Sequence, residues 1–201
     1  MTTEFVKLAL KRLRYLMVAA LVACTTSAFA QSYAFQLDPH QSQVAFTLDD
    51  VLHTVRGTFQ LKSGSIRFAS STGAASGLLV VDATSGDSGS KARDRKMHKD
   101  ILESQKFPEI SFAPQRIVGQ VPLEGKSQIT IEGVMTLHGQ QHPMSILAPV
   151  DVHAGRATAD LSFLVPYVQW GLKNPSTFIL RVSDKVKIDI HAVGSITPAG
   201  Q

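Results

Sequence analysis

Seven histidines are the residues of this 201-residue chain whose type and spacing come closest to a chemical site. His138 and His142 flank a predicted three-residue turn, Gly139–Gln141, so they could face each other across a hairpin at metal-ligand spacing. A third ligand would have to come from elsewhere, for example His53 or His98. Two histidines without a neighbouring carboxylate or cysteine make an incomplete zinc site. The sequence therefore predicts turn-flanking surface histidines, with no bound metal or other cofactor.

Motifs for nucleophilic or nucleotide chemistry are missing from the sequence. The chain contains no Gly-x-Ser-x-Gly, no P-loop and no Gly-x-Gly-x-x-Gly after a predicted strand. Its one cysteine, Cys24, lies in an N-terminal segment that differs from the rest of the chain. We therefore predict that the protein is not an enzyme. The alternative is a metal- or histidine-dependent envelope stress protein or enzyme that uses His138 and His142.

Residues 1–30 have the pattern of a secretory signal peptide. Four basic residues come first: Lys7, Lys11, Arg12 and Arg14. Nine apolar residues follow, Tyr15–Ala23, and Ala28-Phe29-Ala30 then supplies small residues at alternate positions. An apolar run of this length is too short to span a bilayer as a helix. Cleavage after Ala30 would leave residues 31–201 as one folded domain in the periplasm.

Cys24 allows a second interpretation of the same segment. Leu21-Val22-Ala23-Cys24 resembles a bacterial lipobox, in which the cysteine is lipidated and becomes the new N-terminus. The product would be a periplasm-facing lipoprotein with a membrane tether through Cys24. Both interpretations place the folded part outside the cytoplasm, and the sequence does not choose between them.

The charge of the chain is concentrated in this N-terminal segment. The formal net charge is +4, from 20 basic and 16 acidic residues. Residues 1–30 hold four of the basic residues and one of the acidic ones, which leaves a net charge of +1 for residues 31–201. Nucleic-acid binding requires a clustered positive surface. No nucleic-acid partner is therefore predicted.

Apolar and polar residues alternate with a period of two through most of the chain after Gln31, which predicts β-strands. The predicted strands are 43–48, 53–61, 65–68, 77–83, 110–113, 128–138, 143–153, 156–165 and 185–194. Half-polar alternation is typical of antiparallel sheets with one dry face and one wet face. About eight such strands can close into a barrel or stack as a sandwich.

Two segments depart from this alternation. Lys91–Ser104 is rich in charged residues and good helix formers, with Met97 and Ile101 four residues apart, and predicts one short helix. Ser90 is its predicted N-cap, after a flexible lead-in over residues 84–89. Pro166–Thr177 is irregular and long enough to cover an opening or shape a rim. The fold class is thus all-β with one short helix.

The apolar positions mix large and small residues. Phe46, Phe59, Met135 and Phe163 are large, whereas Gly57, Gly133, Ala157 and Ala159 are small. An eight-stranded barrel is just wide enough to be filled by side chains or to hold one small ligand. The pattern alone leaves both outcomes open.

Six motifs, in order, resemble the YceI family. They are Leu37-Asp38-Pro39 with Ser42–Phe46, Val55–Phe59, Gly64–Phe68, Arg93–Met97, Phe107–Phe112 and Gly133–Gly139. The resemblance covers nearly all of residues 33–194. It implies an antiparallel, lipocalin-like β-barrel of about eight strands that is exported and holds a long apolar chain, such as a polyisoprenoid.

The family resemblance and the alternation together predict a carrier or buffer for a polyisoprenoid or quinone-precursor type of lipid, without turnover. The predicted ligand-binding residues inside the barrel are Phe46, Phe59, Met135, Leu137, Phe163 and Ile188. Met97, Ile101 and Trp170 are predicted to lie at its mouth. The sequence does not determine the oligomeric state, and a dimer is one possibility.

Overall fold

Nine antiparallel strands make up most of the part of the chain that the computed structural model describes, residues 31–49, 54–176 and 181–199. The strands are β1 (Ser32–Leu37), β2 (Gln43–Asp49), β3 (Thr54–Ala69), β4 (Ala75–Asp87), β5 (Glu109–Val118), β6 (Gly125–Leu137), β7 (Gln140–His153), β8 (Arg156–Val165) and β9 (Val186–Pro198). The helix α2 (Lys91–Lys96) and the π-helical turn η1 (Met97–Ile101) lie between β4 and β5. The predicted signal peptide, Cys24 and His53 lie outside the described residues.

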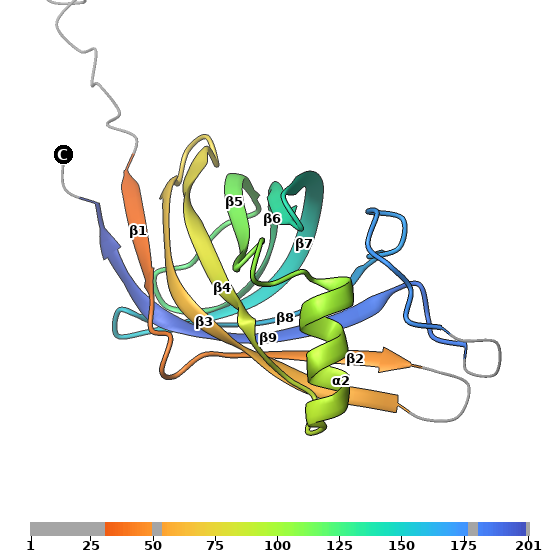
Figure 1. The fold of residues 1–201 in the computed structure, drawn as a ribbon. Helices are drawn as coiled ribbons and strands as arrows, with labels where there is room; N and C mark the ends of the chain where they lie inside the picture. The colour runs from red at the N-terminus through yellow and green to blue at the C-terminus, as the bar shows by residue number, and fades with distance from the viewer. Residues whose placement is uncertain (1–30, 50–53, 177–180, 200–201) are drawn as a thin grey trace, which may run out of the picture.

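The strand order around the sheet is β3-β2-β9-β8-β7-β6-β5-β4. The sheet closes into a barrel because β3, at one end of this order, also pairs with β4, at the other end (Figure 1). Strands β1 and β2 follow one another in the same position of the barrel, between β3 and β9. Both pair with β3 and with β9, and Leu37 of β1 lies opposite Gly194 whereas Gln43 of β2 lies opposite His191. Nine strands therefore fill eight barrel positions, which confirms the predicted fold class. Strand β1 itself was not predicted.

Two of the register shifts in the sheet explain where the alternation in the sequence changes phase. In β3 the register shifts between Leu61 and Ser63, and in β5 it shifts between Pro114 and Arg116. A bulge adds one residue to one strand, so inward positions move from odd to even numbers or the reverse. The predicted strands 53–61 and 65–68 are for this reason the two halves of one long strand.

One end of the barrel, which we call the filled end, is packed solid. Its buried core residues come from β1, β3, β5, β6, β7, β8 and β9: Tyr33, Ile66, Phe68, Ile117, Ile129, Ala148, Val152, Ala157 and Ile196. Ala148 and Val152 are completely inaccessible to solvent. The rings of Tyr33 and Phe68 stack with centroids 5.7 Å apart. Dense packing of this kind is typical of a protein core.

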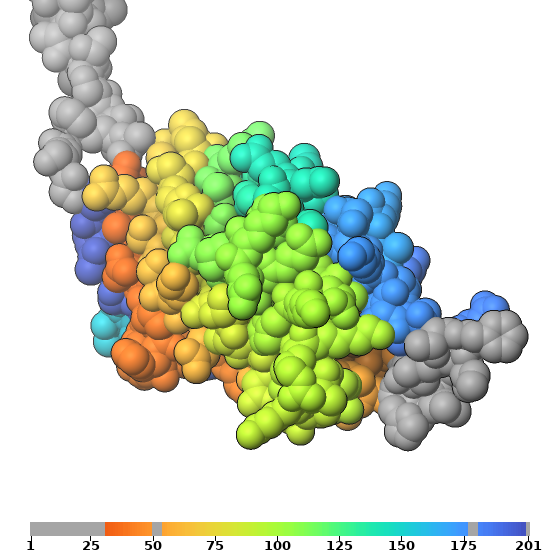
Figure 2. All heavy atoms as spheres, in the orientation of Figure 1, coloured from red at the N-terminus to blue at the C-terminus, as the bar shows by residue number. Residues whose placement is uncertain are grey.

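The helix lies against the barrel toward its other end, which we call the hollow end (Figure 1). In the space-filling view the yellow-green atoms of this region cover the front of the barrel (Figure 2).

The predicted helix, Lys91–Ser104, is regular only as far as Lys96 and then widens into η1. The predicted flexible lead-in is wrong, because β4 continues to Asp87. Ser90 takes the N-cap position but makes no side-chain capping bond. No helix within the described residues is long and apolar enough to cross a membrane.

Candidate functional site

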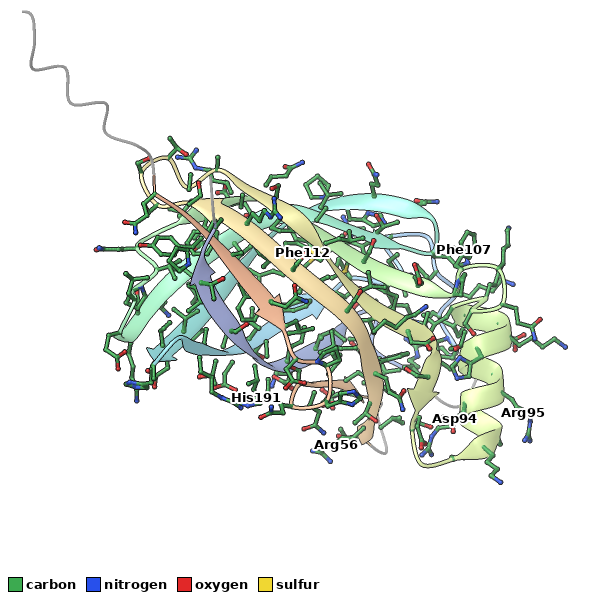
Figure 3. All side chains as sticks on the ribbon, turned by 90° about the vertical axis from the view of Figure 1, so that its left-hand side faces the viewer. Arg56, Asp94, Arg95, Phe107, Phe112 and His191 are labelled. Atoms are coloured by element: carbon green, nitrogen blue, oxygen red, sulfur yellow. The ribbon has the colours of Figure 1, made fainter. Side chains whose placement is uncertain are left out.

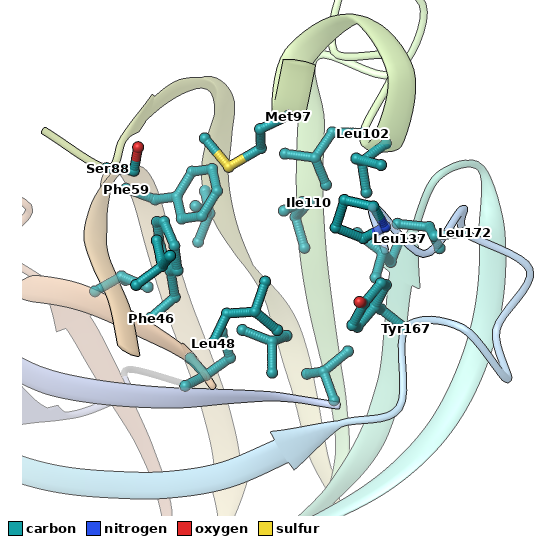
Figure 4. Close-up of a pocket in the computed structure, with 18 of the residues that line it drawn as sticks. Phe46, Leu48, Phe59, Ser88, Met97, Leu102, Ile110, Leu137, Tyr167 and Leu172 are labelled. Carbon is teal, nitrogen blue, oxygen red and sulfur yellow. The ribbon is translucent and has the colours of Figure 1, made fainter. Parts of the chain in front are cut away.

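The hollow end encloses a cavity of about 490 Å³. This volume is in the usual range for small-molecule sites, about 300–1,000 Å³. Nearly all of its lining is apolar, and Figure 4 shows aromatic and aliphatic side chains pointing into it from strands on opposite sides. The apolar lining is Val44, Phe46, Leu48, Val55, Phe59, Val81, Met97, Ile101, Leu102, Ile110, Met135, Leu137, Phe163, Val165, Leu172, Pro175, Val182, Val186, Ile188 and Ile190.

A glycine allows one of the aromatic side chains to lie flat against the wall. Gly57 of β3 is the direct cross-strand partner of Phe46 in β2. A Cβ atom at Gly57 would collide with the Phe46 ring. The ring thus covers the glycine and meets Phe59 with centroids 5.4 Å apart. The two rings form the side of the cavity beneath Met97 (Figure 4).

The helical segment forms the roof of the cavity. Met97 and Leu102 point into the cavity from the helical segment (Figure 4), and Ile101 also lines it. His98 anchors this roof to β4, because its Nε2 lies 2.9 Å from the Gly86 carbonyl and its Nδ1 lies 3.0 Å from the Ser104 hydroxyl. Both ring nitrogens of His98 are therefore engaged in holding the roof.

The barrel wall is incomplete between β7 and β8 at the hollow end. These strands pair only over Val150–His153 and Arg156–Ala159, at the filled end. Residues 166–175, which we call the strap, follow β8 and bring the buried side chains of Tyr167 and Leu172 to the cavity wall. The Tyr167 hydroxyl donates a hydrogen bond to the Ser183 carbonyl at 2.6 Å. Burial raises the pKa of Tyr167 to about 12, so the phenol stays neutral.

Eight of the nine predicted ligand-binding residues line the cavity: Phe46, Phe59, Met97, Ile101, Met135, Leu137, Phe163 and Ile188. The ninth, Trp170, lies outside the lining, where its indole stacks on the His142 ring at 4.0 Å with an interplanar angle of 2°. That these residues bind a ligand stays a prediction. The strap residues Tyr167 and Leu172 were missed, because an irregular segment has no periodicity that shows which side chains point inward.

The structure does not place His138 and His142 opposite each other, the arrangement that a three-residue turn would have allowed. The hairpin turn consists of His138 and Gly139 only, with φ of 53° and 74°, and both values are those of a two-residue type I′ turn. His142 then lies opposite Met135, not opposite His138. His138 instead approaches Glu103 at 3.5 Å.

Of the other candidate ligands, His98 has both ring nitrogens occupied by the Gly86 carbonyl and the Ser104 hydroxyl. Burial lowers the pKa of His142, which favours its neutral form against Trp170. Within residues 31–49, 54–176 and 181–199, no group of three His, Cys, Asp or Glu side chains is arranged to hold a metal ion. The described geometry therefore gives the histidine-dependent alternative no support.

The polar part of the lining consists of Ser88, Arg93, Lys96 and Tyr167. Ser88 is buried, and its backbone N–H and hydroxyl donate to the Asp94 carboxylate at 2.9 and 2.6 Å. These hydrogen bonds lower the pKa of Asp94. The cavity is thus an apolar chamber with a cationic edge near α2.

A closed antiparallel barrel of eight positions with one apolar interior cavity defines a protein of the lipocalin-like barrel class. The chain belongs to the YceI family, since residues 35–194 match the family described as "YceI-like domain". Among curated relatives, a UPF0312 protein of Vibrio cholerae is 24% identical over 182 residues, which cover 88% of this chain and 94% of the relative. A UPF0312 protein of Vibrio parahaemolyticus is 27% identical over 134 residues, 65% of this chain and 69% of the relative.

Solved structures share the same fold at low sequence identity. BcnA of Burkholderia cenocepacia superposes with a TM-score of 0.64 at 19% identity, covering 78% of this chain and 98% of its own. A polyisoprenoid binding domain from Saccharophagus degradans gives 0.60 at 15% identity, covering 81% and 98%. The YceI protein of Campylobacter jejuni gives 0.56 at 13% identity, covering 75% and 88%. These structures confirm the predicted barrel fold, and the family match confirms the predicted family.

Proposed function

We propose that this protein binds one long apolar chain, of the polyisoprenoid or quinone-precursor type, inside the hollow end and carries or buffers it in the periplasm without turnover. The observation that carries this proposal is the apolar chamber of about 490 Å³ in a barrel whose other end is solid. The similar fold of the polyisoprenoid binding domain from Saccharophagus degradans supports it.

The apolar lining of the chamber favours the binding of a hydrocarbon chain. Each Å² of apolar surface removed from water contributes roughly 25 cal/mol, so a long hydrocarbon gains most when it is enclosed on all sides. All the barrel strands from β2 to β9 except β7, together with the roof and the strap, surround the chamber with apolar side chains. A flexible chain can follow such a wall without any specific hydrogen bond, which favours lipid over a polar metabolite.

The filled end determines how the chain lies. Because Ile66, Ile129 and Val152 close that end, a ligand can pass in and out only at the hollow end. The tail of the lipid then lies deepest, against the filled core, and the polar head stays near α2. The polar groups of the lining include no ready general base, since Arg93 and Lys96 are cations and the Tyr167 phenol has a pKa of about 12.

Export is part of the proposal and rests on residues 1–30. Native mass spectrometry of the full-length protein, purified from its own host, tests export and binding together. We expect a chain that begins at Gln31 or at a lipidated Cys24, and one apolar molecule per protein that is released on denaturation. An uncleaved chain would contradict export.

A matched pair of variants tests whether the chamber is the binding site. Ile110→Trp places an indole in the chamber and is expected to abolish chain binding. Leu164→Trp makes the same change on the outer face of β8, where the side chain is 57% exposed, and is expected to bind like the wild type. Equal binding by both variants would contradict the proposal.

A further inference from the structure

Two covers close the hollow end, and they are attached to the barrel in different ways. The roof is tied by hydrogen bonds to β4 and to the residue after it. His98 Nε2 donates to the Gly86 carbonyl at 2.9 Å. The Asp94 carboxylate of α2 accepts from the Ser88 N–H and hydroxyl at 2.9 and 2.6 Å. Asp94 thus points toward the end of β4, whereas Arg95 points away from the barrel (Figure 3). Lifting the roof would break several of these bonds.

The strap is attached by hydrogen bonds on one side only, to the segment before β9. The Tyr167 hydroxyl donates to the Ser183 carbonyl at 2.6 Å. The Val168 N–H and the Asn174 side-chain amide donate to other carbonyls of the same segment, residues 182–184. None of the hydrogen bonds formed among the described residues joins the strap to β7. The strap is therefore hinged on the side of β8 and β9.

Against β7 the strap is held by side-chain packing. The Trp170 indole stacks on the His142 ring at 4.0 Å. Tyr167 and Leu172 belong to the same apolar cluster as Ile146 of β7. The His142 Nε2 atom is buried and has no hydrogen-bond partner within the part of the chain that the structure describes. A buried polar atom without a partner is destabilising, so a movement of the strap that lets water reach this nitrogen removes a penalty of the closed state.

The gap behind the strap is a feature of the sheet itself. Strands β7 and β8 pair only over Val150–His153 and Arg156–Ala159, so residues 140–149 have no partner strand on that side. Pro143 and Pro149 lie in this stretch, and proline, which has no N–H, is found mainly on strand edges without a partner. Strand β7 is described over its whole length and contributes no side chain to the cavity lining. Displacement of the strap would therefore open the chamber sideways.

We propose that the strap is a side gate, which swings away from β7 about its attachment to β8 and β9, so that the apolar chain enters and leaves the chamber between β7 and β8. His142 and Trp170 form the latch of this gate. The inference rests on the proposed function for the nature of the ligand and goes beyond it in giving the route. The roof stays closed during exchange, because its hydrogen bonds hold it to β4. No strand pairing has to break, since none exists at the gap.

Thiol labelling without ligand tests the gate itself, on full-length protein that carries Cys24→Ser. Ile146→Cys places a thiol behind the strap and Ser104→Cys places one in the roof, at side chains that are 6% and 3% exposed. After correction for global unfolding, we expect the thiol behind the strap to react about tenfold faster or more, because the strap opens more often. Equal or slower labelling behind the strap would overturn the gate.

Release of bound retinol, a fluorescent isoprenoid alcohol, tests whether a chain uses this route. Trp170→Ala removes the latch, and release is expected to become about three- to tenfold faster, as the loss of one ring stack predicts. Leu164→Ala lies on the outer face of β8 and is expected to release retinol at the wild-type rate. An unchanged rate in Trp170→Ala would contradict the latch.

A reversible covalent bridge closes the gate and keeps the test valid if loss of the indole unfolds the strap. His142→Cys/Trp170→Cys, joined by a short thiol-reactive linker on the Cys24→Ser background, is expected to retain bound retinol until a reductant cleaves the bridge. Leu164→Cys/Lys187→Cys is the matched control, since these residues are direct cross-strand partners in β8 and β9. With the same linker it is expected to release retinol at the wild-type rate.

The outcomes distinguish the gate from the proposed function. Undiminished release from the bridged strap would overturn the gate and leave chain binding intact. A folded wild-type protein that binds no retinol would count against the proposed chain binding, and thiol labelling would still decide whether the strap opens.

Discussion

The two ends of this barrel are built from the same kinds of residue and largely from the same strands, with β1 at the filled end and β2 at the hollow end, yet one is densely packed and the other is hollow. At the filled end the side chains of facing strands meet, and Ala148 and Val152 are fully enclosed. At the hollow end β7 separates from β8, the strap fills the gap and α2 with η1 spans the top. The difference shows that strands continuous through both ends can combine a stabilising core with a binding site.

The largest expected effect is the loss of an aromatic ring from the filled end. Phe68→Ala removes a ring that is only 6% exposed and stacked on Tyr33, and is expected to lower the free energy of unfolding by about 3–5 kcal/mol. Phe59→Ala at the hollow end is expected to lower it by only about 1–2 kcal/mol, since that ring partly faces the cavity. Urea denaturation of both variants measures the difference, and equal losses would contradict the division into two ends.

A large side chain added to each end sharpens the same comparison. Ile129→Trp overfills the packed core and is expected to lower stability by about 1–3 kcal/mol. Ile110→Trp enters existing space and is expected to lower it by less than about 1 kcal/mol while it blocks chain binding. Thermal unfolding and a binding assay on the two variants test this, and a reversed order of stability would show that the chamber is not empty space.

Adding a methyl group at Gly86, beneath the roof, is expected to have a smaller effect on stability and on chain binding. A Cβ atom at Gly86 would lie 2.6 Å from Met97 Cε and 2.6 Å from Phe59 Cε1, and both are far ends of side chains that can move. Gly86→Ala should therefore shift these side chains into the chamber, with a stability loss of about 1 kcal/mol and several-fold weaker binding of a long chain. Titration with the chain compound that binds the wild type measures this. Unchanged affinity would mean that the roof does not contact the ligand.

The smallest expected effect concerns pH at the outer side of the strap. Burial lowers the pKa of His142 below its usual 6.5, so its contribution to stability is present above that pH and is lost as the pH falls toward the folded-state pKa. His142→Phe keeps a ring against Trp170 and removes the titration. Between pH 7.5 and 5.5 the wild type should lose about 1–2 °C more in Tm than the variant. Equal losses would show that protonation of His142 does not loosen the strap.

Regular alternation made much of the fold predictable from the sequence. The range of β8, Arg156–Val165, agrees with its prediction at both ends, because inward and outward positions alternate there without interruption. The same alternation identified Phe46, Met135 and Ile188 as inward residues. Where a bulge changes the phase, as in β3 after Leu61, the pattern indicated two strands in place of one.

Local geometry that depends on backbone conformation was less accessible. The turn after β6 places two residues at positive φ, so His138 and Gly139 form it alone and His142 belongs to β7. A turn one residue longer would have put the two histidines opposite each other. A one-residue difference in turn length thus decided whether a pair of possible ligands existed.

The sequence by itself determined most of the antiparallel strands, the helix near residue 91 and the strand side chains that face the interior, because a period of two is a local property of the chain. Only the tertiary structure decided that the interior is solid around Val152 and open around Phe46. Both ends are lined by apolar residues, and whether they leave a space depends on how closely distant strands approach. Arg93 and Lys96 are likewise ordinary helix residues in the sequence, and the fold brings them to the edge of the chamber.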